Sequence, residues 1–235
     1  MPEFQRQHHR IIARMLRALN AELLEQSECF FGGGTHLAMA FGEYRESRDI
    51  DFLCSSRTGF RALRETVTDD ALGAILLRPL SLARAVRADR DGIRTFLAAD
   101  GERIKFEILL EGRIDLAGKR DRRLGVPALD LEHAIAEKLL ANADRGLDDS
   151  TLSRDLIDLA FVAANVGRRE LEQGLAVAEQ AYGTIVRQQL ARALEEFQKN
   201  RTRAKAHIKS LAIEDTTTLR KGLRTLRALG AHASV

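Results

Sequence analysis

The sequence predicts an α/β protein, in which a small mixed sheet with flanking helices is followed by a bundle of helices. In the first half, short apolar runs alternate with turns, and Asp100-Gly101 between two such runs is a strong hairpin signal. From Asp130 onward, apolar residues recur at helical spacing. We therefore expect two domains, residues 1–118 and residues 119–235.

The apolar pattern predicts each element in chain order. Gly167 and Gly183 mark helix ends in the second half. The expected elements of the first half are a helix (4–26), a strand (29–31), a helix (35–41), a strand (49–54), a helix (60–71) and strands at 74–82, 84–90, 93–99 and 103–110. The expected helices of the second half are 130–143, 151–165, 168–182, 184–199 and 214–229.

Composition narrows the class of protein. The 235 residues are 45% hydrophobic with a net charge of +3, so the chain can bury a core. Cys29 and Cys54 are its only cysteines, which excludes a disulfide framework and a zinc cluster of cysteines. The N-terminal region has arginines where a signal peptide has an apolar core, and no apolar run could span a bilayer. We expect a cytoplasmic protein with no membrane partner.

Two aspartates lie one strand repeat apart in the expected strand 49–54. Side chains alternate between the faces of a strand, so Ile50 and Phe52 would enter a core while Asp49 and Asp51 share the other face. Two such carboxylates are within reach of one divalent cation, which prefers oxygen ligands. The alternative is an edge strand with a solvated acidic face.

A run of three glycines precedes these aspartates. Gly33, Gly34 and Thr35 stand between an aromatic strand and a short helix. Glycine lets the backbone approach a ligand closely, and the free N–H groups at a helix start suit a phosphate. The alternative is a plain strand-to-helix turn capped by Thr35.

These two motifs together resemble the nucleotidyltransferase pattern of a glycine turn, a helix and Asp-x-Asp on a strand. The wording Gly-Gly-Thr-x-Leu-Ala followed by Ser-x-Asp-Ile-Asp-Phe is most similar to the AbiEii/AbiGii toxin family of type IV toxin–antitoxin pairs. The resemblance covers about residues 28–162 and implies a nucleotidyltransferase-like sheet. It also places Ser47 among the nucleotide-binding residues.

A third carboxylate is expected at Glu107. Ile104, Phe106 and Ile108 share one face of their strand, and Lys105 and Glu107 share the other. The family carries Lys-x-Asp or Lys-x-Glu here, which implies that Glu107 is a metal ligand or general base. The alternatives are a cross-strand Lys–Glu pair and, as a competing carboxylate, Asp115.

The expected helices near residues 131–165 resemble the second block of the family. Lys138 and Arg145 lie on one helical line, and Asp155 and Asp158 share the face of another helix. The resemblance implies that Lys138 and Arg145 bind phosphates, and that one of Asp155 and Asp158, with Asp158 preferred, orients Lys138, Arg145 or the nucleotide. The alternatives are a snorkelling lysine and a surface cluster of ion pairs, with Arg154 paired to Asp158.

The C-terminal region is basic. From Arg187 onward there are eleven Lys or Arg residues against four Asp or Glu, and Arg201, Arg203 and Lys205 belong to its densest part. Such a region could contact the phosphates of a nucleic acid, or it is a solvated helix face.

We therefore predict an enzyme that moves a nucleotidyl group from a nucleoside triphosphate (NTP) to an acceptor, with Mg²⁺ or Mn²⁺ as cofactor. The resemblance implies a toxin with a tRNA acceptor and a partner antitoxin. The alternatives are the same chemistry on a protein or small-molecule hydroxyl, and a non-catalytic regulator that binds a nucleotide or a partner.

Overall fold

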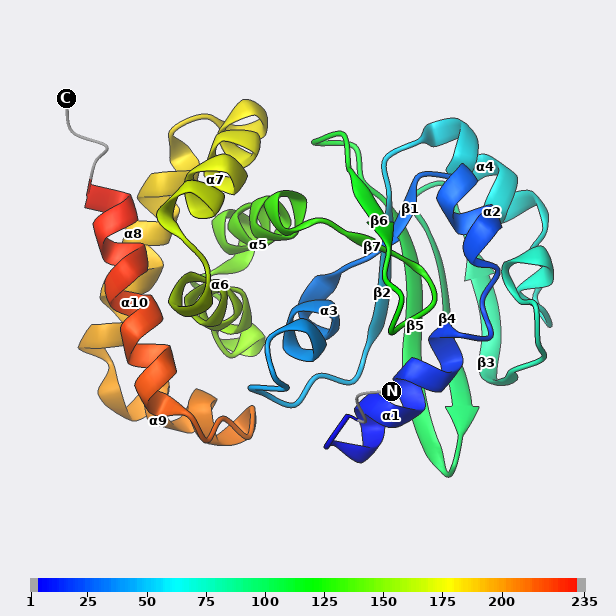
Figure 1. Ribbon diagram of the computed structural model, residues 1–235, viewed down its shortest axis with the longest axis horizontal. Coiled ribbons are helices and arrows are strands. Elements are labelled where there is room, and N and C mark those ends of the chain that lie inside the picture. The colour runs from blue at the N-terminus through cyan, green and yellow to red at the C-terminus, as the bar shows by residue number, and fades with distance from the viewer. Residues whose placement is uncertain (1–3, 232–235) are drawn as a thin grey trace. The chain divides into compact units, whose positions relative to one another are not determined.

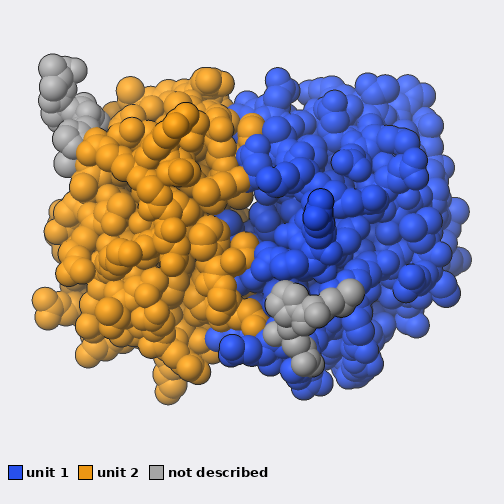
Figure 2. Space-filling view, viewed as in Figure 1, with its two compact units in different colours: residues 1–39, 48–130 blue, residues 40–47, 131–235 orange. Residues whose placement is uncertain are grey.

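The computed structural model describes residues 4–231 and divides the chain into two compact units. The sheet unit comprises residues 1–39 and 48–130, and the helical unit comprises residues 40–47 and 131–235 (Figure 2). This division differs from the expected boundary at residue 118. Strand β7 (Pro127–Leu129) pairs with strand β1 (Cys29–Phe31), so the segment 119–130 belongs to the sheet.

The described part of the sheet unit contains a seven-stranded mixed sheet with the order β3-β4-β5-β2-β1-β7-β6 (Figure 1). The parallel pairs are β2 with β5 and β1 with β7, and the other neighbours are antiparallel. The remaining strands are β2 (Ile50–Cys54), β3 (Ser81–Ala88), β4 (Gly92–Ala99), β5 (Glu102–Leu110) and β6 (Gly118–Arg120). The predicted α/β class is confirmed.

Strands β2 and β5 have the alternation that their sequences predict. Ile50 and Phe52 are fully buried on β2, and Phe106 is fully buried on β5. Asp51 lies between the two buried residues of β2 and is half-buried. The apolar residues of both strands thus belong to one core, and the acidic residue takes the opposite face of the sheet.

Three helices bury their apolar residues in the same core as the sheet. They are α1 (Gln7–Leu16), α2 (Ala21–Gln26) and α4 (Arg57–Glu65). The prediction of one helix over residues 4–26 was wrong, because α1 ends at Leu16 and Asn20 caps the separate helix α2. Its side chain accepts a hydrogen bond from the Leu23 N–H at 3.2 Å.

The hairpin at Asp100-Gly101 is confirmed, since β4 and β5 pair directly across these two residues. Both residues have positive φ angles, 53° and 78°, which is the conformation of a two-residue hairpin turn. The expected strand 74–82 was wrong. Residues Gly73–Ile75 form a 3₁₀ turn, and strand β3 begins only at Ser81, after Pro79.

The described part of the helical unit is built mainly from α-helices (Figure 1). They are α5 (Leu131–Arg145), α6 (Arg154–Asn165), α7 (Arg168–Tyr182), α8 (Ile185–Lys199), α9 (Arg201–Ser210) and α10 (Thr216–Ala231). Helices α6 and α10 approach so closely that a Cβ atom at Gly222 would lie 1.7 Å from the Ala160 carbonyl oxygen. None of the helices within residues 4–231 has both the length and the apolar character needed to cross a bilayer.

Candidate active site

The structure brings Asp51 and Glu107 together. The two residues are register partners on the parallel strands β2 and β5. Opposite residues of neighbouring strands share a face of the sheet, about 5 Å apart. Asp49 lies one residue before β2 and is half-buried. Asp51 and Glu107 therefore lie on adjacent strands although they are 56 residues apart in the sequence, and Asp49 directly precedes the first of these strands.

The glycine turn lies against the carboxylate of Asp51. Helix α3 (Gly33–Ala40) begins at Gly33 rather than at the expected Thr35. Thr35 belongs to the first turn of this helix and is fully buried. Gly33 has a φ of +67°, and a Cβ atom there would lie 2.6 Å from Oδ2 of Asp51. Both the backbone conformation and this close approach require glycine.

Glu107 is paired with two cations. Its carboxylate lies 2.6 Å from Nζ of Lys105, two residues away on β5, and 3.6 Å from Nε of Arg94 on β4. The expected alternative of a cross-strand Lys–Glu pair is met only in part, because Lys105 pairs with Glu107 along the same strand and the cross-strand cation is Arg94. Arg94 was missed by the sequence analysis, although counting back from the turn at Asp100-Gly101 identifies it as the partner of Glu107.

The carboxylates match a divalent cation in chemical type. Asp49, Asp51 and Glu107 offer only oxygen atoms, which Mg²⁺ and Mn²⁺ prefer. Within residues 4–231, no three His, Cys, Asp or Glu side chains are grouped as a metal site. Asp49 and Asp51 would hold the ion, and Glu107 would have to release Lys105 before it could join them.

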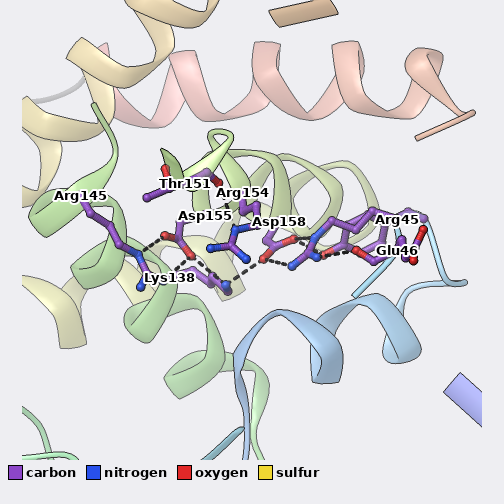
Figure 3. Close-up of polar contacts among 9 residues, drawn as sticks. Arg45, Glu46, Lys138, Arg145, Thr151, Arg154, Asp155 and Asp158 are labelled. Atoms are coloured by element: carbon purple, nitrogen blue, oxygen red, sulfur yellow. Dashed lines mark hydrogen bonds and ion pairs between the residues drawn. The ribbon is translucent and has the colours of Figure 1, made fainter. Parts of the chain in front are cut away.

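A chain of alternating charges runs through the helical unit (Figure 3). Asp158 on α6 binds Arg45 through both carboxylate oxygens, at 2.6 and 2.9 Å. Nζ of Lys138 on α5 lies 2.8 Å from Asp158 and 2.8 Å from Asp155. Nε of Arg145 donates to Asp155 at 2.8 Å and completes the chain. The sequence analysis expected Lys138, Arg145, Asp155 and Asp158 to act together, and they are in contact.

Burial and charge act in opposite directions on these groups. Burial alone would raise the pKa of Asp158, but Arg45 and Lys138 outweigh it and lower this pKa. In the same way, Lys138 and Arg145 overcome burial and lower the pKa of Asp155. Burial alone would lower the pKa of Lys138, and the two carboxylates raise it. Lys138, Asp155 and Asp158 are therefore all ionised at neutral pH.

Two members of this network were not expected from the sequence. The side chain of Arg45 is 4% exposed, and the hydroxyl of Tyr44 donates to Asp158 at 2.7 Å. The short segment 40–47 has no periodic pattern that predicts burial, so nothing local identified them. The expected pair of Arg154 with Asp158 was wrong, because Arg154 donates through Nε to the carbonyl of Thr151.

Ser47, Asp115 and the basic residues of helix α9 are the remaining residues that the sequence analysis singled out. Ser47 is half-buried at the end of the segment 40–47, and Asp115 is exposed beyond β5. On helix α9, Arg201 and Lys205 are exposed while Arg203 forms an ion pair with Asp149 at 2.8 Å. Because this segment is a helix, its basic residues are spread around the cylinder.

His36 on α3 is a buried base beside the glycine turn. Its ring packs edge-on against Phe31, with the ring centroids 5.6 Å apart, and Nδ1 has no hydrogen-bond partner among the described residues. Burial lowers the pKa of His36 to about 4, Asp121 opposes this shift, and Arg123 adds to it. The imidazole is therefore neutral at physiological pH.

A glycine turn against an acidic strand, with a third carboxylate on the neighbouring strand, is the arrangement that the resemblance to nucleotidyltransferases led us to expect. The comparison with protein families makes this specific. Residues 14–228 match the model of the family described as Nucleotidyl transferase AbiEii toxin, Type IV TA system. The chain belongs to this family, and the recognition from its motifs is confirmed.

Solved structures confirm the fold. A candidate nucleotidyltransferase from H. pylori is 18% identical with a TM-score of 0.55, and the match covers 97% of this chain and 94% of that one. JHP933 from Helicobacter pylori is also 18% identical, with a TM-score of 0.54 and coverage of 96% and 91%. The comparison with curated proteins gave no match.

Replacing Asp158 with asparagine should destabilise the helical unit strongly. The change leaves Arg45 and Lys138 buried with too little opposing charge, and breaking one side of a buried ion pair costs about 3–5 kcal/mol. Urea unfolding followed by circular dichroism measures this loss. Glu172→Gln breaks an exposed pair with Arg168 on α7 and should cost less than about 1 kcal/mol. Equal losses of unfolding free energy in the two variants would contradict a structural role for the buried ion pairs of Asp158.

Acidification should weaken folding through His36. Above pH 6.5 its imidazole is neutral in the folded and the unfolded chain, and below that pH the unfolded chain binds the proton first. The contribution is therefore lost between pH 6.5 and about 4, by about 3 kcal/mol. The free energy of unfolding, measured at several pH values between 6.5 and about 4, should decline less in His36→Leu than in the wild type. Equal declines in the two proteins would show that His36 is not responsible.

Proposed function

We propose that this protein transfers a nucleotidyl group from an NTP to an acceptor hydroxyl and releases pyrophosphate. One observation carries the proposal: Asp51 and Glu107 are register partners on β2 and β5, and Asp51 lies against the glycine turn at Gly33. Membership of the nucleotidyltransferase family supports it. The turn provides backbone N–H groups for phosphates, and the carboxylates provide oxygen ligands.

The reaction forms one bond and breaks one. The acceptor oxygen bonds to the α-phosphorus of the NTP, and the bond from this phosphorus to the bridging oxygen of the β-phosphate breaks. Pyrophosphate leaves, and the hydroxyl proton passes to the carboxylate of Glu107 or to water. A divalent cation held by Asp49 and Asp51 would supply charge stabilisation for the phosphates.

Several residues would bind the nucleotide. The N–H groups of Gly33, Gly34 and Thr35 lie at the start of α3 and would receive a phosphate. Lys138 and Arg145 remain the predicted phosphate cations, with Asp155 and Asp158 as the groups that orient them. The side chain of Arg145 is half exposed, so it has the freedom to meet a ligand.

The partners follow from the family. A type IV toxin–antitoxin family implies an antitoxin partner. We propose an RNA acceptor, with tRNA as the first candidate, because a basic chain can contact a long polyanion. The sequence pI of about 9.1 is consistent with this choice.

The decisive experiment is incubation with each α-³²P-labelled NTP, Mg²⁺, total RNA and total protein. Label in the RNA fraction together with released pyrophosphate is the expected result. Label in the protein fraction would replace the RNA acceptor by a protein hydroxyl. NTP binding without any labelled product would instead support a non-catalytic regulator.

Removing either aspartate of the motif should abolish transfer while folding is preserved. Asp49 and Asp51 lie outside the apolar core, so Asp49→Ala and Asp51→Ala lose a metal ligand and little packing. Initial rates with labelled NTP should fall by a factor of about 1,000 or more, which is about 4 kcal/mol of barrier.

The third carboxylate is tested separately. Glu107→Gln should also lose transfer, and Asp115→Ala decides between the two candidates. If Asp115→Ala were inactive while Glu107→Gln kept the wild-type rate, the assignment of Glu107 would be wrong.

Gly33→Ala should weaken NTP binding at the start of helix α3, where the backbone N–H groups would receive a phosphate. The new Cβ would meet Asp51 at 2.6 Å and would also occupy a left-handed conformation, which costs about 1–2 kcal/mol. Gly101→Ala is the matched control, because its φ is +78° but nothing lies within 4 Å of a Cβ there. Fluorescent-NTP titration should show weaker binding only for Gly33→Ala. Similar NTP affinities for both variants would show that Gly33 forms the turn without contributing to NTP binding.

A further inference from the structure

A basic cavity lies on the sheet beside Glu107. It has a volume of about 160 Å³ and opens on the strands β3, β4 and β5. Its lining residues are Arg84, Arg87, Arg94, Thr95, Phe96, Lys105 and Glu107. We refer to the set Arg84, Arg87, Arg94, Lys105 and Phe96 as the basic strip.

Strand register arranges the basic strip in two rows. Arg84, Phe96 and Lys105 are opposite one another on β3, β4 and β5. Arg87, Arg94 and Glu107 form the next row, which β2 continues with Asp51. The second row thus starts with cations and ends with the candidate catalytic carboxylates.

An irregularity in β3 puts both of its arginines on one face. Arg84 and Arg87 are three residues apart, so a regular strand would point them to opposite faces. Their partners Phe96 and Arg94 are two residues apart, and the register shifts between Arg84 and Arg87. A β-bulge of this kind re-aims a side chain, while Val86 between the arginines stays buried in the core.

The strip has more positive charge than its carboxylate partners offset. Arg94 and Lys105 lie near Glu107, and Arg94 also pairs with Asp89. Arg84 and Arg87 are exposed, and neither side chain forms an ion pair within residues 4–231.

The strip also offers an aromatic ring. Phe96 is half-buried in the middle of the first row. The guanidinium of Arg103 lies over this ring, 5.4 Å from its centroid. Cations around a partly exposed aromatic ring form the combination that binds single-stranded nucleic acid, with phosphates on the cations and a base on the ring.

We propose that the basic strip binds the single-stranded end of an acceptor RNA. Arg84 and Arg87 contact phosphates, and Phe96 stacks with a base. From Arg87 to Asp51 the row crosses three strand spacings, about 14 Å, which a short run of nucleotides spans. This inference rests on the proposed function, because it takes the carboxylates at the end of the row as the site of transfer.

Binding of a fluorescent 12-nucleotide single-stranded RNA, followed by anisotropy without NTP or metal ion, tests the proposal. Arg84→Ala/Arg87→Ala should bind at least about tenfold more weakly at low salt. The slope of log affinity against log salt should fall by about 1.4, or 0.7 for each lost phosphate contact. Arg168→Ala/Arg169→Ala removes two exposed arginines from α7 and is the matched control, with unchanged binding expected.

Two further variants separate charge from stacking. Arg84→Lys/Arg87→Lys keeps both charges and should keep the salt slope. Phe96→Leu should weaken RNA binding about tenfold with the slope unchanged, because it removes a stacking surface and no charge. Loss of the slope in the lysine variant, or wild-type affinity of Phe96→Leu, would overturn the proposed contacts.

NTP titration of the same variants distinguishes failure of the proposed function from failure of the proposed RNA contacts. If the wild type fails to bind NTP or to transfer label, the proposed function fails. If NTP binding is normal but RNA affinity depends on Arg201, Arg203 and Lys205 rather than on Arg84 and Arg87, the inference alone fails. Loss of NTP binding in Arg84→Ala/Arg87→Ala would also overturn it, since the strip would then hold the triphosphate.

Discussion

The parallel pairing of β2 with β5 is the constraint on which the candidate site depends. Its register places Asp51 opposite Glu107. A slip of one residue would carry Phe52 out of the core and an aspartate into it, and the cost of that exchange holds the register. The aromatic core formed by Phe52 and Phe106, whose ring centroids are 6.2 Å apart, thereby sets the spacing of the carboxylates on the other face.

In the helical unit, each buried charge of this network has neighbours of the opposite sign. Arg45, Asp158, Lys138 and Asp155 alternate in sign through distances of 2.6 to 2.9 Å, and all four are buried. Buried charges of this kind need partners of the opposite sign, since each desolvated ion alone would be costly. Arg45 belongs to the segment 40–47, which precedes Asp49 and strand β2 in the chain.

The features predicted correctly from the sequence depend on residues that are close together in the chain. The hairpin at Asp100-Gly101 follows from turn chemistry, and its two-residue turn also determines that Arg94 faces Glu107. The position of α3 was two residues off because Gly33, with its positive φ, could open the helix before Thr35. Arg45 was missed because its partner Asp158 is 113 residues away and no periodicity marks the segment around it.

The sequence by itself determined the alternation of β2 and β5, the glycine turn, the helical second half and the membership of a nucleotidyltransferase family. The first three depend on side-chain periodicity and backbone propensity over a few residues, and the family membership follows from the resemblance of short motifs. Only the tertiary structure decided that β7 joins β1, that Asp51 lies beside Glu107, and that Arg84 and Arg87 share a face. Strand order, register and bulges are set by the packing of segments far apart in the chain, and spacing along the sequence carries no direct record of them.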